Sequence, residues 1–349
     1  MDRPGKRGKW AEERGEAGRG RSGMRPVIRR ALALAGALLV AACAGPQSSL
    51  DAAGPAAREI NTLGNTMYVG AVLITALVTV LMLLPFRRRR DWRPSNRMLV
   101  LGGGVALPIA VLTPHLIWST NVGYEMRARV GPDAVSIEVT GHVFWWEVAY
   151  RRTDGALART ANEVRIPVGE HVEFLLTSND VIHSFWIPPL GGKTDMIPGR
   201  ITRMTLKADR PGVFRGVCAE YCGAQHSLMA FDVIAMARPE FEAWVESLTR
   251  VPADPPEGLL REGRELFVQA GCASCHGLRG LSDARLGPDL TNVGDRRTIA
   301  AGTLRTNVGT LAGWISSAQH IKPGNRMPSY PGLEGRQLRA LASYLESLK

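Results

Sequence analysis

The stretch "CAEYCGAQHSLM", residues 218–229, decides how this 349-residue chain is interpreted. Together with a histidine upstream in "SNDVIHSFWIPPL", it supplies five potential metal ligands: His183, Cys218, Cys222, His226 and Met229. Thiolate, imidazole and thioether are the ligands that a soft transition metal such as copper prefers. A mononuclear blue-copper site uses one cysteine, whereas two cysteines in one loop can bridge two metal ions, each capped by a histidine. The alternatives are a structural zinc site, which has no use for the methionine, and a disulfide between the two cysteines.

The residues on either side of this stretch predict a β domain. In "AVSIEVTG" the apolar residues Val135, Ile137 and Val139 recur with the period of two that is typical of a half-buried strand. Three other segments have the same pattern, namely "HVEFLLTS" (171–178), "RITRMTLKA" (200–208) and "MAFDVIAM" (229–236). Several short strands separated by Gly and Pro predict a β-sandwich or barrel. A helix is expected to follow at "PEFEAWVESL" (239–248).

The loop resembles the dinuclear copper loop, called CuA, of subunit II of the haem–copper cytochrome c oxidases, and the resemblance covers residues 60–248. It implies a two-helix hairpin followed by a cupredoxin sandwich. It also implies that Cys218 and Cys222 bridge two coppers and that His183 and His226 bind one copper each. The weak axial ligands are then Met229 and the backbone carbonyl of Glu220, whose side chain reaches a magnesium ion at the interface with subunit I. Such a site spreads the charge change over two metals and relays electrons without acting on a substrate.

One segment departs from the family pattern. The family has Gly-His-Gln-Trp before its second strand, and that Trp is where electrons enter from soluble cytochrome c. This chain has "GHVFWWEVAY" (141–150) instead, so that Val143 and Phe144 stand where the family has Gln and Trp. Phe144, Trp145 and Trp146 are therefore the candidate entry residues, and strand packing is the alternative for these aromatic side chains.

A second cysteine pair lies in "GCASCHG", residues 271–277. Cys-x-x-Cys-His is the signature of covalent haem c attachment, with thioethers at Cys272 and Cys275 and with His276 as the proximal iron ligand. Redox dithiols and zinc knuckles share the bare CxxC. A thioredoxin-like site would lie in a βαβ pattern, whereas the stretch before this motif, "LLREGRELFVQA", predicts a helix.

Residues 257–349 resemble a class I cytochrome c. Met327 in "IKPGNRMPSYPGL" is followed by a proline, as the distal iron ligand of that family is, and His320 is the competing ligand. Thioether ligation raises the potential, as an electron donor to copper requires. "LGPDLTNVG" (286–294) resembles the loop that lines the haem. The final segment, "EGRQLRALASYLESLK", has the leucine spacing of an amphipathic helix that packs on the first helix of the domain.

Two apolar stretches predict a membrane anchor. Residues 66–86 and 98–118 are each long enough to cross a hydrocarbon core of about 30 Å, and neither shows a polar face. The arginine-rich loop 87–97 between them is expected to stay in the cytoplasm, so both ends of the hairpin lie outside. The copper and cytochrome domains are then on the periplasmic side of a bacterial inner membrane.

The segment "RPVIRRALALAGALLVAACAG" (25–45) is built like an export signal. Its end resembles a bacterial lipobox, which implies cleavage before Cys43 and attachment of lipid to the thiol; an ordinary signal peptide with a chance cysteine is the alternative. Residues 1–23 add nothing that an export signal needs, so Met24 is a candidate start. The signal peptide is then 24–42 within a leader of residues 1–42.

The net charge of +11 does not indicate a nucleic-acid partner. Residues 1–30 hold ten basic and four acidic residues (+6), and residues 87–97 hold six arginines and one aspartate (+5), so the remainder sums to zero. A nucleic-acid-binding protein spreads its basic residues over a folded face. Here they flank apolar segments, where positive charge sets membrane topology.

The sequence therefore predicts a membrane-anchored multidomain protein with an all-β and then an all-α domain: a hairpin at 60–118, a cupredoxin domain at 125–248, a Pro-rich linker at 249–258 and a cytochrome c domain at 259–349. The resemblance implies subunit II of a caa-type cytochrome c oxidase. Electrons would pass from an external cytochrome or other donor through haem c and CuA to subunit I, which reduces oxygen and pumps protons. Subunit III and membrane lipid are further expected partners. The alternatives are a CuA-bearing subunit of a nitric oxide reductase and a non-catalytic copper-binding protein.

Overall fold

The computed structural model describes residues 30, 45–87, 95–126, 131, 134–152 and 154–349. The predicted leader and signal peptide, the start at Met24, the lipidated Cys43 and most of the arginine-rich loop lie outside the described residues, and they stay predictions. Residues 46–349 form one unit by their contacts, and everything below concerns that unit.

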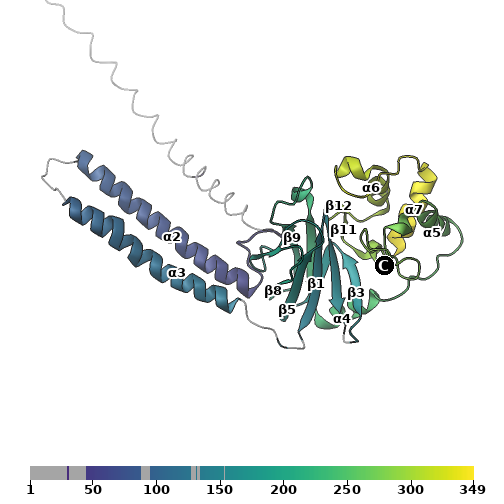
Figure 1. Ribbon diagram of the computed structural model, residues 1–349, viewed down its shortest axis with the longest axis horizontal. Coiled ribbons are helices and arrows are strands. Elements are labelled where there is room, and N and C mark those ends of the chain that lie inside the picture. Colours follow the sequence, from purple (N-terminus) through teal and green to yellow (C-terminus); the bar gives the residue numbers. More distant parts are fainter. Residues whose placement is uncertain (1–29, 31–44, 88–94, 127–130, 132–133, 153) are drawn as a thin grey trace, which may run out of the picture. The chain divides into compact units, whose positions relative to one another are not determined.

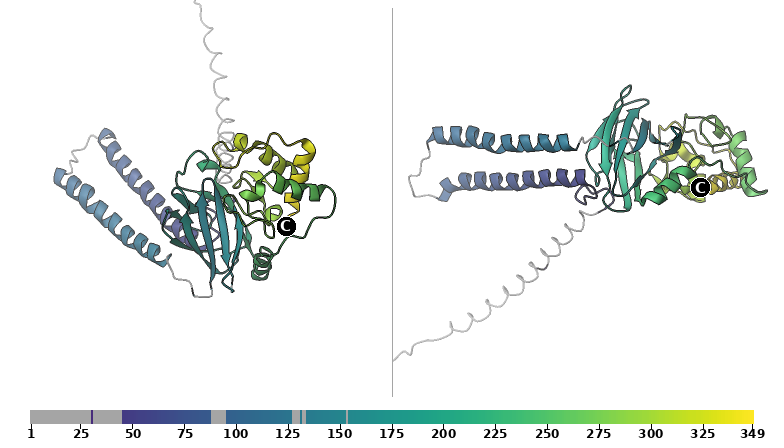
Figure 2. Two further views of the ribbon diagram at one scale, coloured as in Figure 1. Left: turned by 45° about the vertical axis from the view of Figure 1, so that its right-hand side comes forward. Right: turned by 90° about the horizontal axis from the view of Figure 1, so that it is seen from below.

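Two long apolar helices precede the β domain (Figure 1; two further views in Figure 2). The first, α2 (Pro55–Leu83), ends in a 3₁₀ turn, η1 (Leu84–Arg87), and the second begins as a π-helix, η2 (Met98–Ala106), that continues as α3 (Leu107–Glu125). Their length and mean hydropathy of 2.2 and 1.8 suit a membrane span. The helix α2 begins eleven residues before the apolar stretch because its first turns contact the β domain, where Ala57 is buried and Arg58 pairs with Asp209.

The β domain consists of two five-stranded sheets. The first has the order β3-β2-β1-β5-β8, with bounds β1 (Val135–His142), β2 (Trp145–Arg151), β3 (Leu157–Ala161), β5 (His171–Ser178) and β8 (Thr202–Lys207). The second has the order β4-β10-β9-β6-β7, with bounds β4 (Glu163–Pro167), β6 (His183–Trp186), β7 (Lys193–Met196), β9 (Gly212–Cys218) and β10 (Ala230–Met236). The strands predicted at 134–141, 171–178, 200–208 and 229–236 are confirmed as β1, β5, β8 and β10.

An aromatic core joins the two sheets. Trp146, Phe185 and Phe231 are fully buried, and the rings of Phe185 and Phe231 stack with centroids 4.5 Å apart. Gly216 leaves the space for this stack, since a Cβ there would lie 2.1 Å from the Phe231 ring. The core therefore fixes β6, β9 and β10, which are the strands that border the "CAEYCGAQHSLM" loop.

The C-terminal part is helical, as predicted. After α4 (Arg238–Ser247), it contains α5 (Leu259–Gln269), α6 (Val308–Ile321) and α7 (Gly335–Ser347), the short turns η4 (Cys272–Ser274) and η5 (Val293–Asp295), and the two-residue strands β11 (Thr298–Ile299) and β12 (Leu304–Arg305). Leu341 and Leu345 on α7 are buried and Leu338 packs against the same core, which confirms the amphipathic reading of this helix. The helices α5 and α7 cross so closely that a Cβ on Gly263 would lie 2.2 Å from the carbonyl oxygen of Ala340.

This crossing predicts the effect of one methyl group. Gly263→Ala forces the two backbones apart, and we expect it to destabilise the helical domain by about 1–3 kcal/mol, as overpacking does. The matched control is Gly313→Ala in α6, where the added Cβ would meet no atom within 4 Å and should be neutral or stabilising. Thermal unfolding followed at a haem absorption band measures both. Equal transition temperatures for the two variants would contradict the close crossing.

Candidate metal and haem centres

The sulfur-containing loop lies where three strands of the second sheet end or begin. The strand β9 ends at Cys218, β10 begins directly after Met229, and β6 begins at His183. Because β6 pairs with β9 in the register Phe185↔Cys218, the histidine and the cysteine meet at one end of the sheet. Residues 219–229 close over this end and include the short turn η3 (His226–Leu228).

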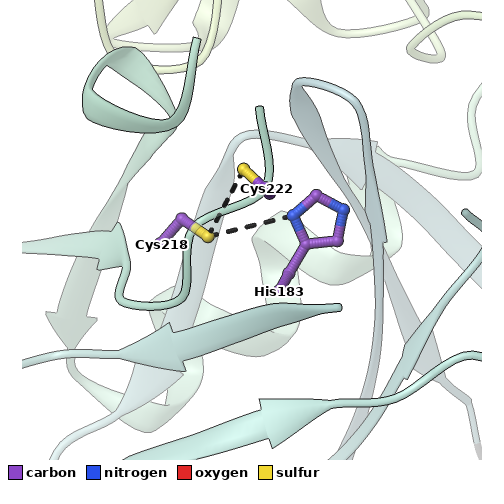
Figure 3. Close-up of side chains that lie close together, drawn as sticks. All are labelled: His183, Cys218 and Cys222. Carbon is purple, nitrogen blue, oxygen red and sulfur yellow. Dashed lines mark hydrogen bonds between the residues drawn. The ribbon is translucent and has the colours of Figure 1, made fainter. Parts of the chain in front are cut away.

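Two thiols form the centre of the site (Figure 3). The Sγ atoms of Cys218 and Cys222 are 3.8 Å apart, and both thiols are buried and free of disulfide bonds. The Nδ1 of His183 lies 3.8 Å from Cys218 Sγ, and the Nδ1 of His226 lies 3.7 Å from Cys222 Sγ. Each thiol therefore has its own imidazole.

The two remaining predicted ligands complete the arrangement. Met229 is buried with its Sδ 3.9 Å from Cys222 Sγ, and the carbonyl oxygen of Glu220 lies 3.2 Å from Cys218 Sγ. The structure thus brings together all six predicted positions. The Glu220 side chain points elsewhere: it is half-exposed and its carboxylate lies 3.4 Å from the Lys193 ammonium.

This donor set fits metal ions. Bonds of about 2.0 Å to imidazole and about 2.3 Å to thiolate, as zinc sites show, allow one ion between each Nδ1 and its facing Sγ. Since the sulfurs are 3.8 Å apart, an ion in either position can reach both thiols. A disulfide would need the sulfurs about 2.05 Å apart. The mixture of thiolate, imidazole and thioether favours copper over zinc.

The surroundings of the two thiols favour ionisation of one of them. The hydrogen bond with Cys222 lowers the pKa of the Cys218 thiol, and the same hydrogen bond raises the pKa of Cys222, so the two thiols share one proton. Burial lowers the pKa of His183, but its hydrogen bonds with Cys218 and Asp180 outweigh burial, and the net pKa is raised. A metal cation bound in place of these protons would be attracted by the same thiolate and by the same Asp180 carboxylate.

Asp180 is a residue that the sequence reasoning did not single out. Its Oδ1 lies 3.0 Å from His183 Nε2, while its carboxylate also accepts hydrogen bonds from the backbone N–H groups of Val143 and Val181. A carboxylate that accepts from one ring nitrogen leaves the other nitrogen free to bind a metal. Gly141 presses on the same ring, since a Cβ there would lie 2.7 Å from His183 Cδ2. The available signal was the position of an aspartate three residues before the histidine.

The helical domain contains a cavity of about 330 Å³ lined by Cys272, Cys275, His276 and Met327. A volume above about 300 Å³ is in the range of cofactor sites. The Nδ1 of His276 lies 2.8 Å from the carbonyl oxygen of Pro288. When Nδ1–H donates a hydrogen bond to this oxygen, Nε2 is left free to bind a metal ion. Burial lowers the pKa of His276 and so favours the neutral ring that binds iron. The competing ligand, His320, is exposed and is not among the residues that line the cavity.

Residues of the β domain close the other side of this cavity: Val143, Phe144, Trp145 and Asn162. Phe144 also contacts the sulfur-containing loop, because its ring lies 3.2 Å from where a Cβ of Gly223 would be. Of the three predicted entry residues, Phe144 and Trp145 thus line the cavity. Trp146 is fully buried in the aromatic core, which is the packing role that had been the alternative.

Comparison with known proteins places the chain in a family. A family model described as "Cytochrome C oxidase subunit II, periplasmic domain" matches residues 147–236, and one described as "Cytochrome c" matches residues 260–349. The chain is 39% identical to cytochrome c oxidase subunit 2 of Alkalihalophilus pseudofirmus, over 89% of this chain and 94% of the other. The chain belongs to the cytochrome c oxidase subunit 2 family. Its identity to the Bacillus subtilis subunit 2 is 30%, over 89% of this chain and 95% of the other.

Subunit 2 of this kind is an oxidoreductase component that carries a fused cytochrome c domain. Membership indicates a membrane-anchored protein that takes part in electron transfer and associates with subunit I of a haem–copper oxidase. The two domain matches indicate copper and haem as the cofactors. Among solved structures, the periplasmic domain of cytochrome oxidase subunit II of Bradyrhizobium japonicum is 32% identical over 34% of this chain and 96% of the other, with a TM-score of 0.32.

The contact between Asp180 and His183 predicts weaker metal binding when the carboxylate is removed. Asp180→Ala leaves the imidazole free to rotate and to change tautomer, and we expect the affinity for copper to fall by about 10- to 100-fold, as for other partners of metal-binding histidines. Asp154→Ala, which removes an exposed carboxylate in the turn between β2 and β3 of the same domain, is the matched control. Titration of copper against a competing chelator measures both. Equal affinities in the two variants would show that Asp180 does not orient the ligand.

Proposed function

We propose that this subunit 2 belongs to a caa-type cytochrome c oxidase and that electrons pass through its own haem c to its own dinuclear copper site. One observation carries the proposal: Phe144 lines the cavity with Cys272, Cys275 and His276 and also contacts Gly223 of the copper loop. A single aromatic side chain therefore links the two candidate cofactor sites. Trp145, beside it, lines the same cavity.

In this proposal Cys218 and Cys222 bridge two copper ions, and His183 and His226 each bind one of them. Met229 and the Glu220 carbonyl are the weak axial ligands. When bound, two thiolate-bridged coppers share one electron, so little rearrangement accompanies each transfer. The protein holds His183 and Cys218 at strand ends and the other ligands in the loop that joins β9 to β10. It also excludes water from the buried thiols and sets the orientation of His183 through Asp180.

The haem attaches covalently at Cys272 and Cys275, with His276 and Met327 as the iron ligands. The position of Met327 in the cavity wall and the exposure of His320 support this choice. Thioether ligation raises the haem potential. Phe144 lies between the cavity that would hold the haem and the loop that would hold the copper, a position that suits electron transfer between them.

The remaining assignments follow the family. The domains are proposed at 125–248 and 259–349 with the linker at 249–258, both on the periplasmic side, with a hairpin at 60–118 in the inner membrane and lipid on Cys43. Subunit I reduces oxygen to water and pumps protons, subunit III completes the complex, and an external cytochrome or other donor reduces the haem. The half-exposed Glu220 carboxylate is the candidate magnesium ligand at the interface with subunit I.

The first test separates the two cofactors. In the purified oxidase we expect the dinuclear copper to give a seven-line mixed-valence resonance, and Cys218→Ser should abolish it while the absorption of haem c is unchanged. Oxygen consumption with reduced donor should stop, although the haem is still reduced. A seven-line signal that persists in Cys218→Ser would overturn the copper assignment.

The second test concerns the path of electrons from haem c to copper. Phe144→Leu removes the aromatic ring between the cavity and Gly223, so we expect electron transfer from photoreduced haem c to copper to slow. Phe174→Leu, a change of the same size in the buried core of the domain, is the control that should not slow it. Time-resolved absorbance at the haem and copper bands measures both rates. If Phe144→Leu and Phe174→Leu transfer electrons at the same rate, Phe144 is not on the route.

A further inference from the structure

Lys322 is a buried lysine at the end of α6, and only 2% of its surface is exposed. Its Nζ donates hydrogen bonds to the carbonyl oxygen of Leu228 at 2.9 Å and to that of Ala300 at 3.0 Å. Lysine is almost never fully buried unless it is paired. Leu228 lies between two predicted copper ligands, and Lys322 itself lines the cavity that holds the predicted haem ligands. One side chain therefore joins the walls of both sites.

Three further contacts join the β domain and the helical domain nearby. Gln225 Nε2 donates to the carbonyl oxygen of Pro323 at 2.8 Å, and the backbone N–H of Ala230 donates to the carbonyl oxygen of Ala301 at 3.0 Å. Arg326 lies 3.9 Å from Asp180, the carboxylate that holds His183. The loop that carries Met327 is thus connected to residues 218–229 through Lys322 and Gln225, and to Asp180 through Arg326.

A separate group of contacts lies around η5. Asp295 accepts hydrogen bonds from Arg165 at 2.7 Å and from Trp244 Nε1 at 3.1 Å. The buried carboxylate of Glu163 accepts from the backbone N–H of Arg297 at 2.9 Å. Asp295 is partly exposed, but the Glu163 carboxylate is only 2% exposed. A buried charge of this kind costs free energy unless its partners are in place, so it tolerates few relative orientations of the two domains.

We propose that Lys322 is a positioning residue that fixes the cytochrome domain on the copper loop in one orientation and holds a positive charge beside the copper site. The domain is then docked as well as tethered. A buried cation stabilises the extra electron of a reduced neighbour, so Lys322 raises the reduction potential of the copper site. Burial lowers the pKa of Lys322 to about 8, which leaves it charged at neutral pH. The docking does not depend on the proposed function, whereas the effect on potential does.

The test uses the full chain in the purified oxidase. Lys322→Met keeps an unbranched side chain of similar length but removes the charge and both hydrogen bonds. We expect amide hydrogen exchange in residues 223–230 and 300–302 to rise by about tenfold or more, with no change in β1 and β5. Lys349→Met, at the other lysine of residues 257–349, is exposed and should change nothing. Unchanged exchange in a folded Lys322→Met protein would overturn the docking role.

Two more variants separate position from charge. Gln225→Ala removes the hydrogen bond to Pro323 from the copper side, so amide hydrogen exchange in residues 322–327 should rise. If Lys322→Met does not fold, this variant alone decides the docking.

Lys322→Met should lower the reduction potential of the copper site, whereas Lys322→Arg, which keeps the charge, should leave it near the wild-type value. Equal potentials in the Met and Arg variants would overturn the role of the charge. A protein that shows the exchange changes but no dinuclear copper signal would refute the proposed function and leave the docking intact.

Discussion

The register of β6 against β9 is the constraint on which the site depends. Pairing of Phe185 with Cys218 brings His183 to the end of the second sheet at which the loop 219–229 begins. A shift of one residue would turn His183 to the opposite face. The register is in turn fixed by the aromatic core, because Phe185 stacks on Phe231 and Gly216 has no side chain that would prevent it. The predicted ligands His183 and Cys218 are thus positioned by packing that lies outside the site itself.

This arrangement suits electron transfer, which needs fixed distances and little rearrangement. The two thiols are held 3.8 Å apart within one loop, and that loop is anchored at both ends by adjacent antiparallel strands, β9 and β10. Asp180 and Gly141 then restrict one imidazole from two sides. Ligands in a short loop fixed at both ends by paired strands are held more precisely than ligands on a free loop.

The sequence predicted what local patterns determine. Four strands follow from the period of two, and the predicted ligand set follows from the resemblance of residues 218–229 to the CuA loop. What it did not predict depends on tertiary contacts. Nothing local shows that Phe144 reaches a cavity formed by residues of the C-terminal helical domain, or that Lys322 is buried against Leu228. The helix α2 also begins before its apolar stretch, because its first turns are stabilised by the β domain and not by the membrane.

The linker illustrates how the tether and the docking act together. A free chain of ten residues would give the cytochrome domain a high effective concentration at the copper domain but a wide range of orientations. Here the linker is itself held: Val251 lies against Gly280, and the Pro255 carbonyl accepts a hydrogen bond from Arg261. The net charges of the two parts are small, −3 for residues 98–256 (14 basic, 17 acidic) and +4 for residues 257–349 (12 basic, 8 acidic). Charges of this size, screened within about 8–10 Å, do not select one orientation. Specific buried contacts select the orientation. Because the linker already keeps the two domains close together, these contacts need only to orient the cytochrome domain and not to bring it to the copper domain.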